Sequence, residues 1–254
     1  MKKIIVITGA SSGMGREFVD QIVKNDMSMD EIWLIARRES VLKGISEQYK
    51  EKTFRILALD LEQEASWLRY EEALKSERPK IMLLINAAGY GVIGQTREID
   101  VHSQTGMIRL NCEALEAITQ ISIPYMKRGS RIIQLASASA FLPQPDFNVY
   151  AASKAFVVHY SRALARELKK DGISVTTVCP GPVQTEFFER AEVLKKSPGY
   201  KKYFRASKEK VVKKALRDAK KKKEVSVYGI SMKAMRLAAK MIPHKLLLKG
   251  LYER

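Results

Sequence analysis

The sequence predicts an α/β protein built on a doubly wound parallel sheet. Three observations predict it: short apolar runs alternate with amphipathic stretches, a glycine-rich turn directly follows the first run, and 46% of the 254 residues are hydrophobic. Strands buried on both faces appear as continuous apolar runs, and their alternation with helices is typical of parallel sheets. We therefore expect a Rossmann-like sheet of seven strands in the order 3-2-1-4-5-6-7, with right-handed crossovers.

The apolar runs locate the expected strands, and the amphipathic stretches locate the helices. Strands are expected at residues 3–8, 32–36, 54–59, 81–86, 131–137, 174–179 and 225–228. Helices are expected near residues 13–25, 38–50, 64–76, 103–127, 150–170 and 208–223. We expect a single domain over residues 1–229, followed by a basic amphipathic extension over residues 230–254.

Charge is distributed unevenly along the chain. Residues 1–189 hold 24 Lys and Arg against 23 Asp and Glu, whereas residues 190–254 hold 21 against 5, so the last quarter carries almost all of the net charge of +17. This asymmetry predicts an anionic partner for that quarter. Two cysteines, Cys112 and Cys179, make no disulfide framework and favour a reducing, cytoplasmic location. No apolar run is long enough to span a membrane or to act as a secretory signal.

The first strand leads directly into the turn Thr8-Gly9-Ala10-Ser11-Ser12-Gly13-Met14-Gly15. Glycines allow a tight turn there, and the N-terminus of the next helix presents free N–H groups to a pyrophosphate. The expected dinucleotide-binding residues of this turn are Gly9, Ser11, Ser12, Gly13, Met14 and Gly15. The alternative is a glycine-rich turn that only reverses the chain.

The second strand ends in Ala36-Arg37-Arg38, without the acidic residue that would accept hydrogen bonds from ribose hydroxyls. Two guanidinium groups can instead bind the additional 2′-phosphate of NADP(H). The sequence therefore favours NADP(H) over NAD(H). The alternative is a pair of solvated arginines at the start of a helix.

Polar and small residues follow the next two strands. Asp60 and Leu61 come after the third strand, where a carboxylate could contact the adenine amine; Asp60 could equally cap a helix that begins near Glu62. The stretch Asn86-Ala87-Ala88-Gly89 follows the fourth strand, where small residues leave room for a cofactor and Asn86 can brace neighbouring backbone.

Tyr150 and Lys154 are four residues apart, and thus on one face of a helix. A lysine one turn away, together with an oxidised nicotinamide, would favour the phenolate and lower the tyrosine pKa. An exposed amphipathic helix would show the same spacing by chance. Ser137, thirteen residues before Tyr150, adds a polar group at the end of the fifth strand; Ser139 is the alternative.

Taken together, these motifs resemble the short-chain dehydrogenase/reductase family, in particular its NADP-preferring hydroxysteroid dehydrogenase and 3-oxoacyl reductase-like members. The matching pieces occur in order between about residues 8 and 185: Thr8 to Gly15, Asp60, Asn86 to Gly89, Asn111, Ser137, Tyr150, Lys154 and Pro180 to Thr185. Two departures are Ala87 in the usual N-N-A-G stretch and Ala136 before Ser137, and neither removes a catalytic group.

The resemblance implies a hydride transfer between NADP(H) and a secondary alcohol or ketone. Tyr150 would be the general acid and base, Ser137 would polarise the substrate oxygen, and Lys154 would bind ribose and tune Tyr150. Asn111 would hold a water that relays protons to Lys154. The nicotinamide carboxamide would be bound by Pro180, Gly181, Val183 and Thr185. A non-catalytic dinucleotide sensor or scaffold on the same fold is the alternative.

Substrate is expected above the carboxyl ends of the strands, beneath a lid at about residues 185–223. The expected walls come from Tyr90 and Gly91, from residues 141–147 and from residues 185 to about 203. Because Phe141, Leu142, Phe147, Phe187 and Phe188 are apolar, a lipophilic substrate, steroid-like or acyl, is favoured over a sugar. The alternative is that these side chains only pack the lid against the core.

The C-terminal extension has an amphipathic pattern. Met232, Met235, Ala239 and Ile242 fall on one face and Lys233, Arg236 and Lys240 on another; Pro243 interrupts the pattern, which resumes at Leu246. Such a helix can lie on an anionic membrane surface, or it can pack on the domain or a neighbouring subunit. The family resemblance implies a homo-oligomer, a dimer or tetramer. No nucleic acid is expected. Scattered His102, His159 and His244 predict no metal site.

Overall fold

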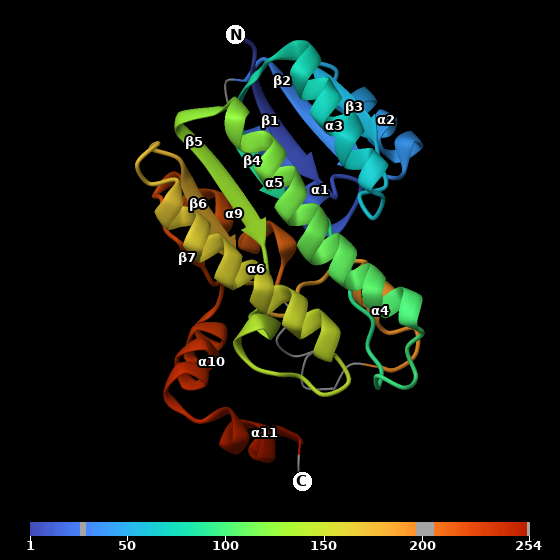
Figure 1. Ribbon diagram of the computed structural model, residues 1–254, viewed down its shortest axis with the longest axis vertical. Coiled ribbons are helices and arrows are strands. Elements are labelled where there is room, and N and C mark those ends of the chain that lie inside the picture. Colours follow the sequence, from blue (N-terminus) through green and yellow to red (C-terminus); the bar gives the residue numbers. More distant parts are fainter. Residues whose placement is uncertain (26–28, 197–205, 253–254) are drawn as a thin grey trace.

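The computed structural model describes residues 1–25, 29–196 and 206–252 and contains a seven-stranded parallel sheet (Figure 1). The strand order is β3-β2-β1-β4-β5-β6-β7, as predicted. The strands are β1 (Lys3–Thr8), β2 (Glu31–Ala36), β3 (Phe54–Ala58), β4 (Lys80–Asn86), β5 (Met126–Leu135), β6 (Ser174–Val178) and β7 (Val225–Ser226). Thr8 pairs with Asn86 and Ala36 with Ala58, so the motifs that follow these strands emerge at one edge of the sheet.

Helices cover both faces of the sheet (Figure 1). They are α1 (Gly13–Lys24), α2 (Glu39–Gln48), α3 (Glu64–Glu77), α4 (Val101–Ile108), α5 (Ala114–Ser122), α6 (Asn148–Glu167), α7 (Phe187–Ala191), α9 (Lys208–Lys220), α10 (Ile230–Met241) and α11 (His244–Tyr252). In β1, Ile5 and Ile7 pack with α1, α2 and α9, whereas Ile4 and Val6 pack with α3, α5 and α6. This alternation explains why β1 is apolar at consecutive positions.

The helix predicted over residues 103–127 is interrupted. After α4, a π-helical turn covers Arg109–Glu113, α5 follows, and a 3-10 turn covers Ile123–Tyr125. A π-turn adds a residue to a helical turn and is frequent at functional sites. Here it contains the buried side chains of Asn111 and Cys112. Helical periodicity alone does not reveal such a change of winding.

Several strand boundaries also differ from the prediction. β5 begins at Met126, five residues earlier than expected, and ends at Leu135, so Ser137 lies beyond the strand rather than in it. β7 is only two residues long. Ser137 instead caps a short 3-10 helix, η3 (Ala138–Phe141), and its hydroxyl accepts a hydrogen bond from the Ser139 N–H. A capping serine belongs outside regular structure, because its side chain takes the place of a backbone acceptor.

The last two helices extend beyond the carboxyl end of the sheet (Figure 1). α10 begins at Ile230, shortly after β7, and contacts η3. α11 follows the break at Ile242-Pro243 that the proline predicted. Within the described residues, none of the helices combines the length and the hydropathy needed to cross a bilayer.

Candidate active site

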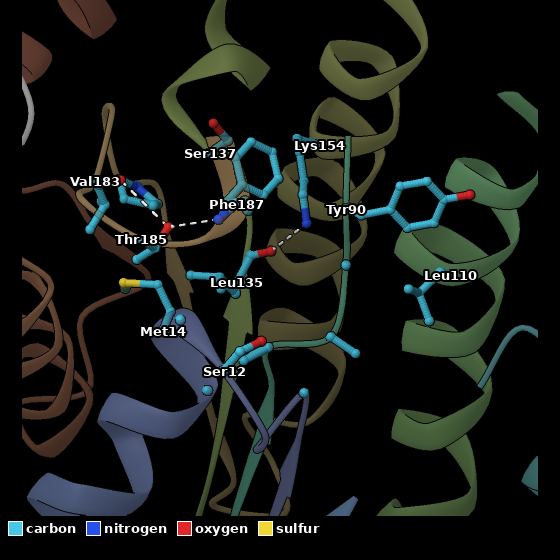
Figure 2. Close-up of a pocket in the computed structure, with 18 of the residues that line it drawn as sticks. Ser12, Met14, Tyr90, Leu110, Leu135, Ser137, Lys154, Val183, Thr185 and Phe187 are labelled. Carbon is cyan, nitrogen blue, oxygen red and sulfur yellow. Dashed lines mark hydrogen bonds between the residues drawn. The ribbon is translucent and has the colours of Figure 1, made fainter. Parts of the chain in front are cut away.

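A continuous cleft crosses the carboxyl ends of the strands (Figure 2). It brings together nearly all of the residues that the sequence singled out. Those lining it are Gly9, Ser11, Ser12, Gly13, Met14, Gly15, Arg37, Arg38, Asp60, Leu61, Ala87, Ala88, Gly89, Ser137, Tyr150, Lys154, Pro180, Gly181, Val183 and Thr185. Asn86 and Asn111 do not line the cleft and lie behind its wall.

The glycine-rich turn is packed against the end of β4. Gly9 has a φ of +67°, and a Cβ there would lie 2.8 Å from the backbone nitrogen of Ala88. A side chain on Gly15 would overlap the carbonyl oxygen of Gly9. Thr8 Oγ1 accepts hydrogen bonds from the N–H groups of Ala87 and Ala88, both at 3.1 Å. The turn is therefore held rigidly, which the chain-reversal alternative does not require.

The turn ends at the N-terminus of α1, which opens into the cleft. Ser12 is the N-cap residue in an extended conformation, its side chain makes no capping hydrogen bond, and the first turn of α1 has no acidic residue. The first N–H groups and the positive end of the helix dipole are thus available for an anion. A cradle without side-chain bulk beside a helix N-terminus fits a dinucleotide pyrophosphate.

The two arginines after β2 lie at the rim of this cradle but point differently. Arg38 Nη2 donates hydrogen bonds to Ser11, at 3.1 Å to the carbonyl oxygen and 3.2 Å to Oγ. Arg37 pairs with Glu62 on the other side, with Nη1 3.8 Å from Oε1. Both side chains are exposed, so each keeps unused donors for a phosphate.

Asp60 lies in a turn after β3. Its Oδ1 accepts a hydrogen bond from the Glu62 N–H at 3.2 Å. The helix predicted near Glu62 begins instead at Glu64, with Gln63 as the N-cap residue, so the interpretation of Asp60 as a helix cap is wrong. The carboxylate remains at the cleft, and the Leu61 carbonyl accepts a hydrogen bond from Trp67 Nε1.

Asn86 has a structural position. Its Nδ2 donates to Thr119 Oγ1 at 2.9 Å and to Gln134 Oε1 at 3.0 Å. The expected bracing of neighbouring backbone is therefore wrong, because the partners of the buried Asn86 amide are side chains. A contact between Asn86 and the cofactor stays a prediction. The Asn86 side chain joins β4, β5 and α5 behind the cleft.

Tyr150 lies in the first turn of α6 and is buried, as is Lys154 one turn later. Burial excludes the alternative of an exposed amphipathic helix at this point. The Tyr150 ring is stacked on Phe147, with centroids 4.3 Å apart, and lies 5.4 Å from the ring of Phe187. Burial raises the pKa of Tyr150 to about 12, against an opposing hydrogen bond from Ser137. At neutral pH the phenol is therefore protonated.

Lys154 is held by backbone. Its Nζ donates to the carbonyl oxygen of Leu135 at 2.9 Å (Figure 2), and burial lowers its pKa to about 8. Nζ lies 5.8 Å from the centroid of the Tyr150 ring, and burial is the largest cause of the raised Tyr150 pKa. In the chain without a cofactor, the expected lowering of the Tyr150 pKa by Lys154 is therefore not seen, because desolvation is the largest effect on the pKa of both groups.

Asn111 is fixed by the π-turn. Its Oδ1 accepts a hydrogen bond from the Tyr90 N–H at 3.0 Å, and its Nδ2 donates to the Tyr90 carbonyl at 2.9 Å and to Ser153 Oγ at 3.0 Å. A Cβ on Gly89 would lie 2.7 Å from Asn111 Oδ1 and 3.2 Å from Lys154 Nζ. The amide and the ammonium thus flank the same glycine, which is the neighbourhood that a shared water would need.

The aromatic walls are only partly those predicted. Phe147, Phe187 and Phe188 line the cleft, so packing is not their only role. Phe141 and Leu142 do not line it. Phe141 packs instead with the cluster around Val157 and Cys179, and the Arg236 guanidinium lies 5.9 Å from its ring centroid. Of the lid predicted over about residues 185–223, α7 lies at the cleft, and the end of the predicted wall at Tyr203 lies outside the described residues. The prediction is wrong for α9, which packs on α1 and the sheet as part of the core.

Sequence reasoning missed three contributors to the cleft. Met232 and Met235 of α10 line it, and Met232 packs directly over Gly181. The amphipathic spacing of these methionines left open whether they face a membrane or pack on the domain, and it gave no sign that they reach the cleft. The Leu135 carbonyl that holds Lys154 is a backbone group and leaves no signal in the sequence.

Comparisons with known proteins agree with this geometry. The sequence profile of the family described as short chain dehydrogenase matches residues 3–194. The chain is 30% identical to sulfoacetaldehyde reductase 2 of Chromohalobacter salexigens, over 74% of this chain and 75% of that protein. It is 32% identical to the very-long-chain 3-oxoacyl-CoA reductase of Rattus norvegicus, over 71% of this chain and 59% of that protein.

Solved structures share the fold. A short-chain dehydrogenase from Sphingobium yanoikuyae in complex with NADPH superposes with a TM-score of 0.82 at 24% identity, covering 96% of this chain and 95% of that one. A short-chain dehydrogenase/reductase from Burkholderia phymatum in complex with NAD gives 0.81 at 21% identity, covering 97% and 95%. The two neighbours were solved with different nicotinamide dinucleotides.

Proposed function

The chain belongs to the short-chain dehydrogenase family and is an oxidoreductase acting on CH–OH or C=O groups, and we propose that it uses NADP(H) to interconvert a secondary alcohol and a lipophilic ketone. The observation that carries this proposal is the buried group of Ser137, Tyr150 and Lys154, the last two one helical turn apart, in the same cleft as the glycine-rich turn. A dinucleotide bound there would supply or accept the hydride.

Each side chain has a proposed role that follows from its surroundings. The Ser137 hydroxyl holds the substrate oxygen, and the Tyr150 hydroxyl donates a proton to that oxygen during reduction and accepts it during oxidation. A Tyr150 pKa near 12 suits donation, because the proton is present at neutral pH. Oxidation needs a cationic neighbour that stabilises the phenolate, and Lys154 in its protonated form can become that neighbour.

Lys154 and Asn111 complete the proton path. Lys154 Nζ keeps donors free beyond its bond to Leu135, so it can bind ribose hydroxyls and pass a proton to Tyr150. Asn111 Oδ1 has a second lone pair beside its bond to Tyr90, and it can hold a water next to Gly89. We assign the carboxamide site to Pro180, Gly181, Val183 and Thr185, which line the same end of the cleft.

The preference for NADP(H) rests on Arg37 and Arg38. Arg38 is already directed to the phosphate-binding turn by its bonds to Ser11, and Arg37 lies across the rim beside Glu62. Titration of the purified protein with NADPH and with NADH, followed by nicotinamide fluorescence, tests this part. Tighter binding of NADPH is the expected result, and equal or tighter binding of NADH would refute the phosphate site.

The substrate class rests on the apolar wall of Phe147, Phe187, Phe188 and the two methionines. The test is NADPH oxidation with a panel that includes a long-chain 3-oxoacyl thioester, a steroid ketone and sulfoacetaldehyde, which is small and anionic. We expect turnover of the lipophilic compounds and little with sulfoacetaldehyde. Preference for the small anion would overturn the lipophilic assignment. Dinucleotide binding without turnover of any carbonyl compound would favour the sensor alternative, which needs the turn but not Ser137 or Tyr150.

Three further assignments concern the surroundings of the enzyme. We propose a cytoplasmic location and a homo-oligomer, a dimer or tetramer, which sedimentation velocity of the full chain tests directly. We also propose that the basic quarter associates with an anionic membrane surface. Within that quarter, we assign this membrane association to one face of the C-terminal helices.

A further inference from the structure

The outer face of α10 and α11 is apolar and exposed. Ile230, Leu237 and Met241 are 86%, 62% and 75% exposed, and their spacing of seven and four residues places them on one side of α10. Ile242, the C-cap residue of α10, and Leu246 in the first turn of α11 add exposed apolar side chains on either side of Pro243. Large apolar side chains gathered at one end of a molecule are characteristic of interaction sites, whereas single ones are ordinary.

This face is not the one that the sequence pattern indicated. Met232 and Met235 point to the opposite side, where they line the cleft, so for these two side chains the packed alternative is the correct one. The side chain of Met232 packs over Gly181, and Arg236 lies over the ring of Phe141. α10 therefore has two apolar faces: an inner face that walls the cleft and an outer face that is exposed.

The charges around the outer face have one sign. Lys233 and Lys240 are exposed, and the helical spacing places them along one border of the outer face. Lys245 and Lys249 continue the positive charge along α11, and residues 230–252 contain no Asp or Glu. An anionic bilayer has negatively charged headgroups above an apolar interior. A positively charged border around exposed apolar side chains is complementary to such a surface.

The other strongly basic segment of the last quarter lies elsewhere. Lys220 to Lys223 connect the end of α9 to the start of β7, at the amino end of that strand, whereas α10 follows its carboxyl end (Figure 1). These two basic segments, Lys220 to Lys223 and the helices α10 and α11, thus lie at opposite ends of β7. Of these two ends, the one with α10 and α11 combines positive charge with exposed apolar side chains, whereas none of the large apolar side chains of residues 208–226 is exposed. Val193 and Leu194 are exposed as well, but the neighbouring Lys195 and Lys196 pair with Asp146 and Glu192.

We propose that the outer face of α10 and α11 docks on an anionic lipid bilayer, with Ile230, Leu237, Met241, Ile242 and Leu246 inserted shallowly and Lys233, Lys240, Lys245 and Lys249 at the headgroups. A second copy of the chain is disfavoured on this face, because two such faces would bring like charges together. Docking would place the helix that walls the cleft at the lipid surface. The docking deepens the membrane association proposed above and does not depend on the proposed enzyme activity, whereas the supply of lipophilic substrate by this route does.

The test uses the full chain and two charge-matched triple variants. Lys233→Gln/Lys240→Gln/Lys245→Gln removes three positive charges beside the outer face, and Lys213→Gln/Lys220→Gln/Lys221→Gln removes three on α9 and its end. All six side chains are exposed, so folding should be retained, and circular dichroism checks it. Co-sedimentation is measured with vesicles of phosphatidylglycerol and phosphatidylcholine, and with phosphatidylcholine alone, at low and at high salt.

We expect the wild-type chain to bind the anionic vesicles only, and salt to weaken binding because it screens exposed charges. The α10–α11 variant should lose roughly a hundredfold in partitioning, whereas the α9 variant should lose only a few-fold. Leu237→Ser/Met241→Ser should also weaken partitioning without changing net charge. Equal losses in both triple variants would show that net charge acts rather than this face, and no sedimentation of wild type at low salt would likewise overturn the proposal.

Two further measurements separate the remaining outcomes. If Leu237→Ser/Met241→Ser changes the oligomeric state in lipid-free sedimentation velocity, the occupant is a second copy and the lipid proposal fails. The second measurement is turnover of a long-chain ketone carried in anionic vesicles. It should fall in the α10–α11 variant while turnover of a water-soluble ketone is unchanged. Vesicle binding without this difference would retain the docking and refute only the route of substrate supply.

Discussion

The two ends of the cleft are constructed differently. At one end, Tyr150, Ser137 and Lys154 are buried, and each has a defined partner: the stacked ring of Phe147, the backbone N–H of Ser139 and the backbone carbonyl of Leu135, respectively. At the other end, Arg37 and Arg38 are exposed and have only loose contacts with Glu62 and Ser11. Both ends line one cleft, yet the functional side chains are buried at the first end and exposed to solvent at the second.

The difference shows which physical effect controls each end. In the buried end, desolvation determines the protonation of both titratable groups, and it moves their pKa values in opposite senses, up for Tyr150 and down for Lys154. In the exposed end, solvent and salt screen the charges, so they contribute a graded preference. Substitutions should accordingly have large effects at the first end and small ones at the second.

The largest effect is expected from Tyr150→Phe, which removes the transferable proton and keeps the stacked ring. Turnover should fall by at least about a hundredfold, as is typical of a general acid, and dinucleotide binding should stay within a few-fold. Steady-state kinetics and fluorescence titration measure the two quantities. Tyr160→Phe, on the same helix but outside the cleft, is the matched control and should keep its turnover. A Tyr150→Phe enzyme that retained turnover would mean that another group is the acid.

Lys154→Met should separate chemistry from stability. Burial lowers the Lys154 pKa from its usual 10.5 to about 8. Between these two pH values the unfolded chain binds more protons at this group than the folded protein does. The free energy of unfolding of wild type should therefore rise with pH in that interval. Methionine removes the cost of burying the charge, and the free energy of unfolding at pH 7 should increase by up to about 3 kcal/mol.

The check on this prediction is urea denaturation of the free protein at pH 7 and at pH 10. Relative to the variant, wild type should gain stability between these pH values, while the variant should lose turnover at both. Lys169→Met, an exposed substitution, controls for the added apolar side chain. A variant less stable than wild type at pH 7 would show that the bond to Leu135 outweighs desolvation.

At the exposed end, Arg38→Ser should weaken NADPH binding by about tenfold or more, with NADH binding nearly unchanged, because one charge-assisted hydrogen bond to phosphate is lost. Arg37→Ser should have a smaller effect, since Glu62 already neutralises part of that charge. Titrations at low and high salt measure both, and salt should reduce the difference between variants. Equal loss of both cofactors in Arg38→Ser would indicate that the arginine supports the turn through Ser11 instead.

The smallest effect is expected from Met235→Ala on the inner face of α10. A smaller side chain widens the cleft, so kcat/KM should shift by about fivefold toward bulkier ketones, which corresponds to about 1 kcal/mol, the lower end of what one apolar contact discriminates. Leu237→Ala, two residues later on the outer face, is the control and should leave kcat/KM for water-soluble ketones unchanged. If both variants shifted selectivity alike, α10 would act on the cleft through its position rather than through Met235.

Much of the fold and of the site follows from the sequence alone. Three motifs are local patterns: the glycine spacing after β1, the arginines after β2 and the Tyr150–Lys154 pair. Each could be assigned from the sequence to a turn, a strand end or one face of a helix. Because parallel strands place their carboxyl ends at one edge, the order of these motifs along the chain also predicted that they meet. The strand order and the position of the cleft were accordingly predictable.

Tertiary structure decided the rest, because packing chooses among arrangements that local patterns leave equal. The π-turn that directs Asn111 toward Tyr90, the Leu135 carbonyl that holds Lys154, and the displacement of Asn86 from the cleft all depend on contacts between distant segments. α10 is the clearest case. Helical spacing shows that it has apolar positions on two sides, but only its packing against Gly181 and η3 determines that Met232 faces the cleft and Leu237 faces outward.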